Sequence, residues 1–99
     1  MEDITPAELR QRQQTGTAPF ILDVREPWEH EETSIPGTQN IPLGSLPDHL
    51  DTLADHQDQE IVVHCRSGAR SAQAKAFLTQ QGFGKVRNLL GGILAWEKL

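Results

Sequence analysis

The only cysteine of the chain, Cys65, lies between a short apolar run and a long helical stretch. The apolar run is Ile61-Val62-Val63, and the helical stretch begins near Arg70. A strand, a tight loop and a helix start aim backbone N–H groups and the positive end of the helix dipole at one point, and such a point binds anions. A helix N-terminus and neighbouring arginines can lower the pKa of a thiol from about 8.5 to between ~3.5 and ~7.5. The pattern therefore predicts a reactive thiolate at Cys65.

The loop after the cysteine is predicted to bind an anionic substrate. Its residues are Arg66, Ser67, Gly68, Ala69, Arg70 and Ser71. A lone cysteine after an apolar run is usually a small core residue, but two arginines, two serines and a glycine within these six positions favour the reactive interpretation. Gly68 is expected to adopt a backbone angle that other residues resist.

The length of the loop distinguishes two kinds of chemistry. Four residues separate Cys65 from Arg70. Protein phosphatases that work through a cysteinyl-phosphate carry one residue more between the cysteine and the arginine, which makes the cradle wide enough for a phosphoryl group. With one amide fewer, the ring of N–H donors closes around a smaller centre. We therefore expect the loop to suit a single terminal sulfur atom better than a phosphoryl group.

The loop resembles the six-residue active-site loop of rhodanese domains, the thiosulfate sulfurtransferase family. Four further segments resemble rhodanese motifs and follow one another in rhodanese order. They are Ile21-Leu22-Asp23-Val24-Arg25-Glu26, Ile35-Pro36-Gly37, Asn40-Ile41-Pro42-Leu43 and Asn88-Leu89-Leu90-Gly91-Gly92-Ile93-Leu94-Ala95-Trp96. One departure is Thr33-Ser34, where the family commonly has Gly-His; it concerns the local loop geometry more than the chemistry, because the thiol and its arginines lie elsewhere.

The resemblance implies a covalent relay of sulfur. The Cys65 thiolate would attack the outer sulfur of thiosulfate or of a persulfide donor and become a persulfide. Cyanide, a small thiol or a protein thiol would then accept the sulfur. The loop amides would stabilise the negative sulfur before and after transfer, as an oxyanion hole does. We expect no cofactor, and no group of residues has the spacing of metal ligands.

The two arginines of the loop, Arg66 and Arg70, are expected to have different roles. Arg66 is the candidate for holding the sulfonate end of thiosulfate, because a guanidinium fork matches a face of oxygens. Arg70 is expected to contact the substrate or to turn inward and pin the loop by pairing with a carboxylate such as Asp23. The resemblance implies that Asp23 and Arg25, in the Asp-Val-Arg motif, support the site in this way.

The length and composition of the chain limit the classes of protein to which it can belong. Ninety-nine residues with 36% hydrophobic content predict a single domain, 1–99, that is a rhodanese domain by resemblance. The formal net charge of −5 argues against nucleic-acid binding, and no apolar run is long enough to cross a membrane. The acidic start Met1-Glu2-Asp3 has no apolar signal core, which makes the cytoplasm the expected location. With one cysteine there is no resolving thiol, so any sulfur on Cys65 must leave to another molecule.

Periodicity predicts the elements that position the site. We expect buried parallel strands over 20–22 and 61–63, a strand over 86–88, a weaker one at 40–41 and a short one ending at Ile4. We expect helices over 6–14, 46–54 and 71–81 and a last helix after Gly91-Gly92. Strands alternating with helices predict a three-layer α/β/α sandwich with a parallel sheet. A five-stranded rhodanese-like sheet is what the resemblance implies.

Three other side chains receive structural interpretations. His64 precedes the nucleophile, but strand alternation should turn it away from Cys65, and a stabilised thiolate needs no general base. Trp28 and Trp96 could line an entrance, but tryptophans more often belong to the core.

Two alternatives stay open. The chain could be a sulfur-delivery or regulatory rhodanese domain of a larger protein, without turnover of its own, since it ends inside its last helix. A cysteine-dependent phosphatase on the same scaffold is disfavoured by the short loop.

Overall fold

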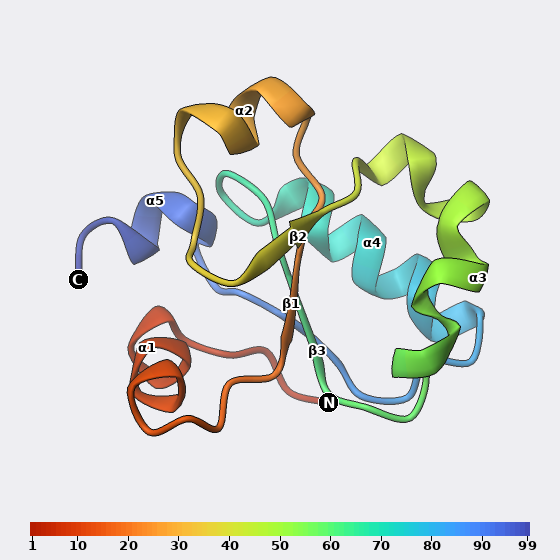
Figure 1. Ribbon diagram of the computed structural model, residues 1–99, viewed down its shortest axis with the longest axis horizontal. Coiled ribbons are helices and arrows are strands. Elements are labelled where there is room, and N and C mark those ends of the chain that lie inside the picture. The colour runs from red at the N-terminus through yellow and green to blue at the C-terminus, as the bar shows by residue number, and fades with distance from the viewer.

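The computed structural model describes residues 1–99 as an α/β fold built on one parallel sheet. The strands lie in the order β2-β1-β3-β4, and all three neighbouring pairs are parallel (Figure 1). Their bounds are Phe20–Asp23 (β1), Thr38–Asn40 (β2), Ile61–His64 (β3) and Val86–Asn88 (β4). The helices are Pro6–Gln14 (α1), Pro27–Glu32 (α2), Leu50–Leu53 (α3), Ala69–Gln80 (α4) and Gly92–Trp96 (α5). None of them has both the length and the apolar character needed to cross a bilayer.

Alternating residues of the central strands face two separate cores. Leu22 and Val63 belong to a cluster that includes Ala74 and Leu78 of α4. Their strand neighbours Ile21 and Val62 belong to a second cluster, with Leu9 of α1 and Ile93 of α5. Because successive side chains of a strand point to opposite faces, helices cover both faces of the sheet. The predicted three-layer arrangement with doubly buried strands is confirmed.

The prediction of a five-stranded sheet is wrong, because the sheet has four strands. The segment ending at Ile4 makes only an isolated parallel bridge to Leu89. Thr5 already caps α1, accepting a hydrogen bond from the Glu8 N–H at 3.1 Å, and Pro6 is its first residue. The chain therefore turns into a helix before a fifth strand can extend.

The predicted helix over 6–14 is confirmed, and the long helix after the loop begins at Ala69, two residues earlier than expected. The prediction of one continuous α-helix over 46–54 is wrong. Residues Leu43–His49 form a 3₁₀-helix that contains Pro47, and only Leu50–Leu53 are α-helical. Proline lacks the N–H that an α-helix interior requires, which explains the tighter turns.

Helix α2 was absent from the sequence prediction. Pro27 occupies its first turn, and the Glu29 side chain accepts a hydrogen bond from the Glu26 N–H at 3.0 Å, as the third helical residue of a capping box does. Both are recognised start signals for a helix, so the sequence did contain the information. This short helix stands at the top of Figure 1, on the side of the molecule where α5 lies.

The parallel sheet brings four polar residues to one edge. Asp23, Asn40, His64 and Asn88 are the last residues of their strands, and Asp23 is in register with both Asn40 and His64. Cys65 follows directly after β3. Ligands of parallel α/β sheets bind outside the carboxyl ends of the strands, so this edge is where a site is expected.

Candidate active site

The sulfur of Cys65 lies inside the loop that joins β3 to α4. The residue is 1% exposed. Its Sγ accepts a hydrogen bond from the Gly68 N–H at 3.0 Å and lies 3.3 Å from the Ser71 Oγ. Gly68 has a φ of +117°, in the region that only glycine adopts readily, and an added Cβ would meet only the Asn88 Nδ2, at an ordinary contact distance of 3.9 Å. The expectation for Gly68 is thus confirmed, and the reason is conformation, not crowding.

Hydrogen bonds to the sulfur favour its ionised form. Burial by itself raises the pKa of Cys65, but hydrogen bonds from the Ser71 hydroxyl and from the backbone N–H groups of Ser71, Gly68 and Ser67 outweigh it. The net result is a thiol pKa below its ordinary value. The site therefore stabilises a thiolate, the nucleophilic form of cysteine.

Asn88 completes the support of the loop and was missed by the sequence analysis. The Ser71 Oγ donates to the Asn88 Oδ1 at 2.6 Å, and the Asn88 Nδ2 donates to the Gly68 carbonyl at 3.2 Å. Asn88 thereby links the loop and the first turn of α4 to the end of β4. A polar residue at the carboxyl end of a predicted parallel strand was the available signal.

The two loop arginines differ in their surroundings. Arg66 is exposed, and its side chain makes no hydrogen bond or ion pair within the chain. The Arg70 guanidinium donates to both carboxylate oxygens of Glu29, at 2.7 and 3.0 Å. Arg70 therefore anchors the loop to α2, and Arg66 is free to meet a ligand.

Arg70 turns to a carboxylate as expected, but Asp23 was the wrong choice of partner, because other donors occupy that carboxylate. The Arg25 side chain binds Asp23 Oδ1 at 3.0 Å and Oδ2 at 2.8 Å, and the Arg25 N–H adds a bond of 3.0 Å. His30 Nδ1 lies 3.0 Å from Oδ2. Burial acts to raise the pKa of Asp23, but these partners and the nearby His64 hold it below its usual range. Asp23 and Arg25 thus support the base of the site together, without contact to the loop arginine.

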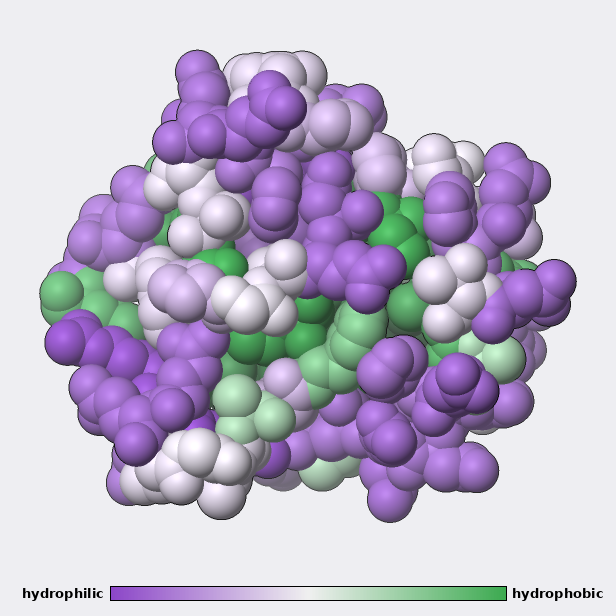
Figure 2. All heavy atoms as spheres, in the orientation of Figure 1, coloured by the Kyte–Doolittle hydropathy of each residue, from purple (hydrophilic) through white to green (hydrophobic).

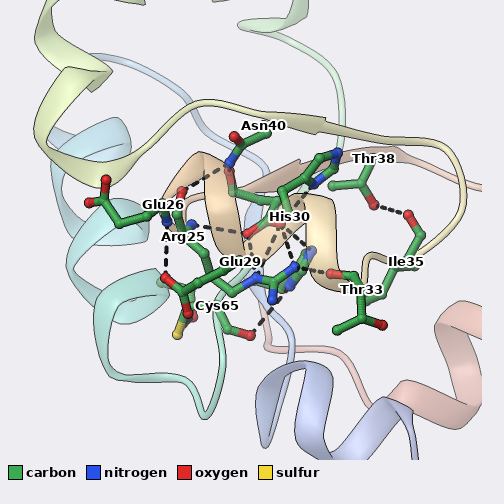
Figure 3. Close-up of polar contacts among 12 residues, drawn as sticks. Arg25, Glu26, Glu29, His30, Thr33, Ile35, Thr38, Asn40 and Cys65 are labelled. Atoms are coloured by element: carbon green, nitrogen blue, oxygen red, sulfur yellow. Dashed lines mark hydrogen bonds and ion pairs between the residues drawn. The ribbon is translucent and has the colours of Figure 1, made fainter.

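Arg25 also explains how the chain accommodates Thr33-Ser34. Its Nη2 donates to the Thr33 carbonyl at 2.7 Å (Figure 3). Asn40 in turn holds the backbone around Arg25 by donating to the carbonyls of Asp23 and Arg25 at 3.0 and 2.9 Å. Because Arg25 binds the backbone at Thr33, this contact does not depend on which side chain stands at that position.

His64 is fully buried and makes no hydrogen bond to the Cys65 sulfur. Its Nδ1 lies 3.3 Å from the Cys65 carbonyl and its Nε2 lies 3.9 Å from Asp23 Oδ2. The interpretation that it turns away from the sulfur is confirmed. Trp96 packs against the second core cluster as expected, whereas Trp28 is 62% exposed, so its assignment to the core is wrong.

A pocket of about 420 Å³ lies beside the loop, between α2 and α5, and we call it the α2–α5 pocket. It is lined by Arg25, Trp28, Glu29, Glu32, Thr33, Arg66, Ile93, Leu94 and Glu97. The N–H groups of Ile93 and Leu94 donate to the carbonyls of Cys65 and Arg66 at 3.0 and 3.1 Å. The start of α5 is therefore fixed on the backbone of the loop, and the pocket borders the reactive segment. No group of three or more His, Cys, Asp and Glu residues is placed to hold a metal ion.

The Glu29–Arg70 ion pair gives a prediction for stability. The Arg70 guanidinium lowers the pKa of Glu29 from 4.5 to about 2. A carboxyl with a depressed folded pKa stabilises the fold above the unfolded value and loses that contribution as the pH falls toward the folded value. Glu29→Gln places an amide NH₂ against the guanidinium, and we expect about 1–2 kcal/mol of lost stability at pH 7, or roughly 4–15 °C in Tm.

Thermal melts at pH 7 and near pH 2 check this prediction. The gap between wild type and Glu29→Gln should shrink as the pH falls from 4.5 toward 2, and Glu31→Gln, an exposed change on the same helix, should melt like wild type. An equal gap at both pH values would show that the ion pair is not its cause.

Comparison with known proteins points to one family. The Rhodanese-like domain family matches residues 5–99. A sulfurtransferase of Allochromatium vinosum is 38% identical over 98 residues, which cover 99% of this chain and 90% of that protein. The human single-domain sulfurtransferase TSTD1 superposes with a TM-score of 0.85 at 28% identity, covering 97% of this chain and 95% of that one. A Rhodopseudomonas palustris protein described as a possible tyrosine phosphatase superposes with a TM-score of 0.88 at 28% identity, covering 99% and 80%.

Proposed function

Since the chain belongs to the rhodanese family of sulfurtransferases, we infer that it moves a sulfane sulfur atom from thiosulfate or a persulfide donor to a thiophilic acceptor through a persulfide on Cys65. One observation carries this proposal: a thiolate-stabilising loop surrounds the only thiol of the chain, with an unpaired arginine beside it.

The proposed reaction has two displacement steps. The Cys65 thiolate attacks the outer sulfur of thiosulfate, the S–S bond breaks, and its electron pair leaves with sulfite. The sulfur stays on Cys65 as a persulfide anion. An acceptor such as cyanide or a thiolate then attacks the terminal sulfur, and the Cys65 thiolate is released.

The loop residues have distinct proposed roles. The Gly68 N–H stabilises the negative charge on sulfur in both steps, and the Ser71 hydroxyl does so when its single proton turns from the Asn88 Oδ1 to the sulfur. The Ser67 N–H also donates to the sulfur, and Ala69, the first residue of α4, ends the loop. Arg66 holds the anionic end of a thiosulfate donor, since its guanidinium has no partner in the chain.

The proposal is tested by incubating the protein with thiosulfate or with a small persulfide and measuring its intact mass. We expect one added sulfur atom with at least one donor, and its removal by cyanide with formation of thiocyanate. A protein that gains no sulfur from either donor would contradict the proposal. Loading without repeated turnover would favour the alternative of a sulfur-delivery domain.

A phosphatase is the second candidate, because of the structural similarity to the Rhodopseudomonas palustris protein. The short loop between Cys65 and Arg70 argues against it. Hydrolysis of an aryl phosphate faster than sulfur transfer would reverse this ranking.

Replacing each of the two loop arginines should have a different effect on kinetics and stability. Arg66→Ala removes a free guanidinium, so the KM for thiosulfate should rise several-fold while Tm stays within about 2 °C of wild type. Arg70→Ala leaves Glu29 without its partner, so both Tm and kcat should fall. Measuring Tm and the thiosulfate kinetics of both variants distinguishes the two roles. An Arg66→Ala protein that melts well below wild type, next to a stable Arg70→Ala protein, would exchange the two roles.

A further inference from the structure

His64 is a buried titratable residue that the proposed reaction does not use. It ends β3 in register with Asp23, and strand alternation places it on the side of the sheet that α1 and α5 cover. Its Nδ1 lies 3.3 Å from the Cys65 carbonyl oxygen, and its Nε2 lies 3.9 Å from Asp23 Oδ2. A carbonyl and an ionised carboxylate can only accept hydrogen bonds. Both ring nitrogens of His64 therefore face acceptors.

A neutral imidazole can satisfy only one of these two acceptors, because it has one N–H and one lone pair. The shorter distance places the N–H on Nδ1, where it donates to the Cys65 carbonyl. Nε2 is then left without a partner, and it is the only buried side-chain nitrogen or oxygen of the chain in that position. An imidazolium, with two N–H groups, would match both acceptors.

The surroundings of His64 decide which form is present. Burial lowers the pKa of His64 below its ordinary value of 6.5, and the charges of Arg25 and His30 act in the same direction. Asp23 and the bond to the Cys65 carbonyl act to raise this pKa but do not outweigh burial. His64 is therefore neutral at pH 7, and it takes up a proton only as the pH falls below 6.5.

The other titratable residues of the helices near this side of the sheet are either exposed or held in ion pairs. The exposed ones are Arg10, Glu26, Glu31, Glu32 and Glu97. The paired ones are Glu8 with Arg87, Arg12 with Glu60, and Glu29 with Arg70. Helix α5 contains no titratable residue. Apart from Cys65 on the opposite face, the groups that face His64 are thus Asp23, Arg25 and His30.

Solvent meets this cluster at α2. His30 of α2 has its Nδ1 3.0 Å from Asp23 Oδ2 (Figure 3). Its side chain is 28% exposed, whereas those of Asp23 and His64 are fully buried. The surface over α2 is largely hydrophilic (Figure 2). A proton from solvent therefore has a route to His64 through His30 and Asp23.

The contact of His64 fixes the peptide group that follows the nucleophile. The Cys65 carbonyl accepts from His64 Nδ1 and also from the Ile93 N–H at 3.0 Å, so it is held from two sides. This peptide group begins the loop whose Gly68 N–H donates to the Cys65 sulfur. A change in its orientation moves the sulfur relative to the donors that stabilise the thiolate.

We propose that His64 is a positioning residue for sulfur transfer: its neutral ring holds the Cys65 carbonyl, and a proton on its Nε2 draws the ring toward Asp23 and weakens that hold. The proposal rests on the sulfurtransferase function argued above. His64 acts through the backbone and not on the sulfur, so it is neither a nucleophile nor a general base. Transfer then requires a neutral His64 as well as a Cys65 thiolate.

Two substitutions separate the hydrogen bond from packing. His64→Asn offers an amide N–H in place of Nδ1 and does not titrate, whereas His64→Leu fills the buried site without a donor. The rate constant for loading of Cys65 by thiosulfate, or by a small persulfide, is measured by intact mass at pH 8. His64→Asn should load within about threefold of wild type, and His64→Leu at least about tenfold more slowly. A packing role would give the opposite order, because leucine buries no polar group.

The pH dependence of loading supplies a readout that packing does not change. Between pH 8 and pH 4.5, the ratio of the wild-type to the His64→Asn rate constant should fall about threefold or more, because only the wild type gains a proton at this position. His30→Gln keeps an N–H donor for Asp23 and removes the other histidine of the cluster. Whatever its basal rate, its dependence on pH should stay that of wild type.

Equal loading of His64→Asn and His64→Leu, or a wild-type to His64→Asn ratio that does not change with pH, overturns the role of His64 and leaves the sulfurtransferase function standing. The pH comparison decides alone if His64→Leu does not fold. A wild-type protein that gains no sulfur from either donor, or a Cys65→Ala protein that loads equally well, overturns the sulfurtransferase function. Alkylation of Cys65 by iodoacetamide, which needs no sulfur transfer, then tests His64 by the same comparisons.

Discussion

Replacing Cys65 with alanine should abolish sulfur transfer to cyanide, with turnover at least about 1,000-fold below wild type. The chain has no other thiol, so no second group can hold the sulfur between the two steps. Thiocyanate formation and intact mass after exposure to thiosulfate or a persulfide provide the measurement. The variant should gain no sulfur.

The fold of the Cys65→Ala variant is the control. Cys65 lies in the core cluster on the α4 side of the sheet, and the change removes a single sulfur atom, so Tm should fall by no more than roughly 10 °C. Turnover close to wild type in this variant would exclude the covalent mechanism.

Replacing Gly92 with alanine should destabilise the protein by about 3–5 kcal/mol and disrupt the loop. Gly92 has a φ of +61°, and an added Cβ would lie 2.4 Å from the Arg66 carbonyl oxygen and 2.7 Å from that of Cys65. Both contacts are with backbone, which cannot rotate aside as a side chain can. Either α5 must leave the loop or the loop must move, and the hydrogen bond from the Ile93 N–H to Cys65 is lost in both cases.

Gly84→Ala is the matched control for this prediction, because Gly84 is not among the glycines with a positive φ and has open space at its Cβ. Thermal melts and sulfur-transfer rates should place Gly84→Ala near wild type. Gly92→Ala should melt at least about 15 °C lower and transfer sulfur poorly. Equal melting of the two variants would mean that the loop and α5 adjust to each other without cost.

Several parts of the site could be predicted because their causes are local in the sequence. The apolar run before Cys65 and the helix after it define a strand, a loop and a helix start, and Gly68 adopts its left-handed angle inside that loop. Thr5 and Pro6 define the start of α1 in the same way. Capping, backbone angles and apolar periodicity act over a few residues, so the sequence expresses them directly.

The pairing of charges depended on positions far apart in the chain. Arg70 and Glu29 are 41 residues apart, and the choice between Glu29 and Asp23 as its partner rests on where α2 places its carboxylate and on Arg25 already occupying Asp23. Asn88 likewise meets Ser71 only because β4 pairs with β3.

By itself, then, the sequence determined the α/β class, the thiol loop and the family resemblance. The tertiary structure decided which acid anchors Arg70, that Ile4 pairs too briefly to add a fifth strand, and that Trp28 faces a pocket. These outcomes depend on how helices pack on the sheet, because burial and long-range contacts select among partners that local propensity leaves equivalent.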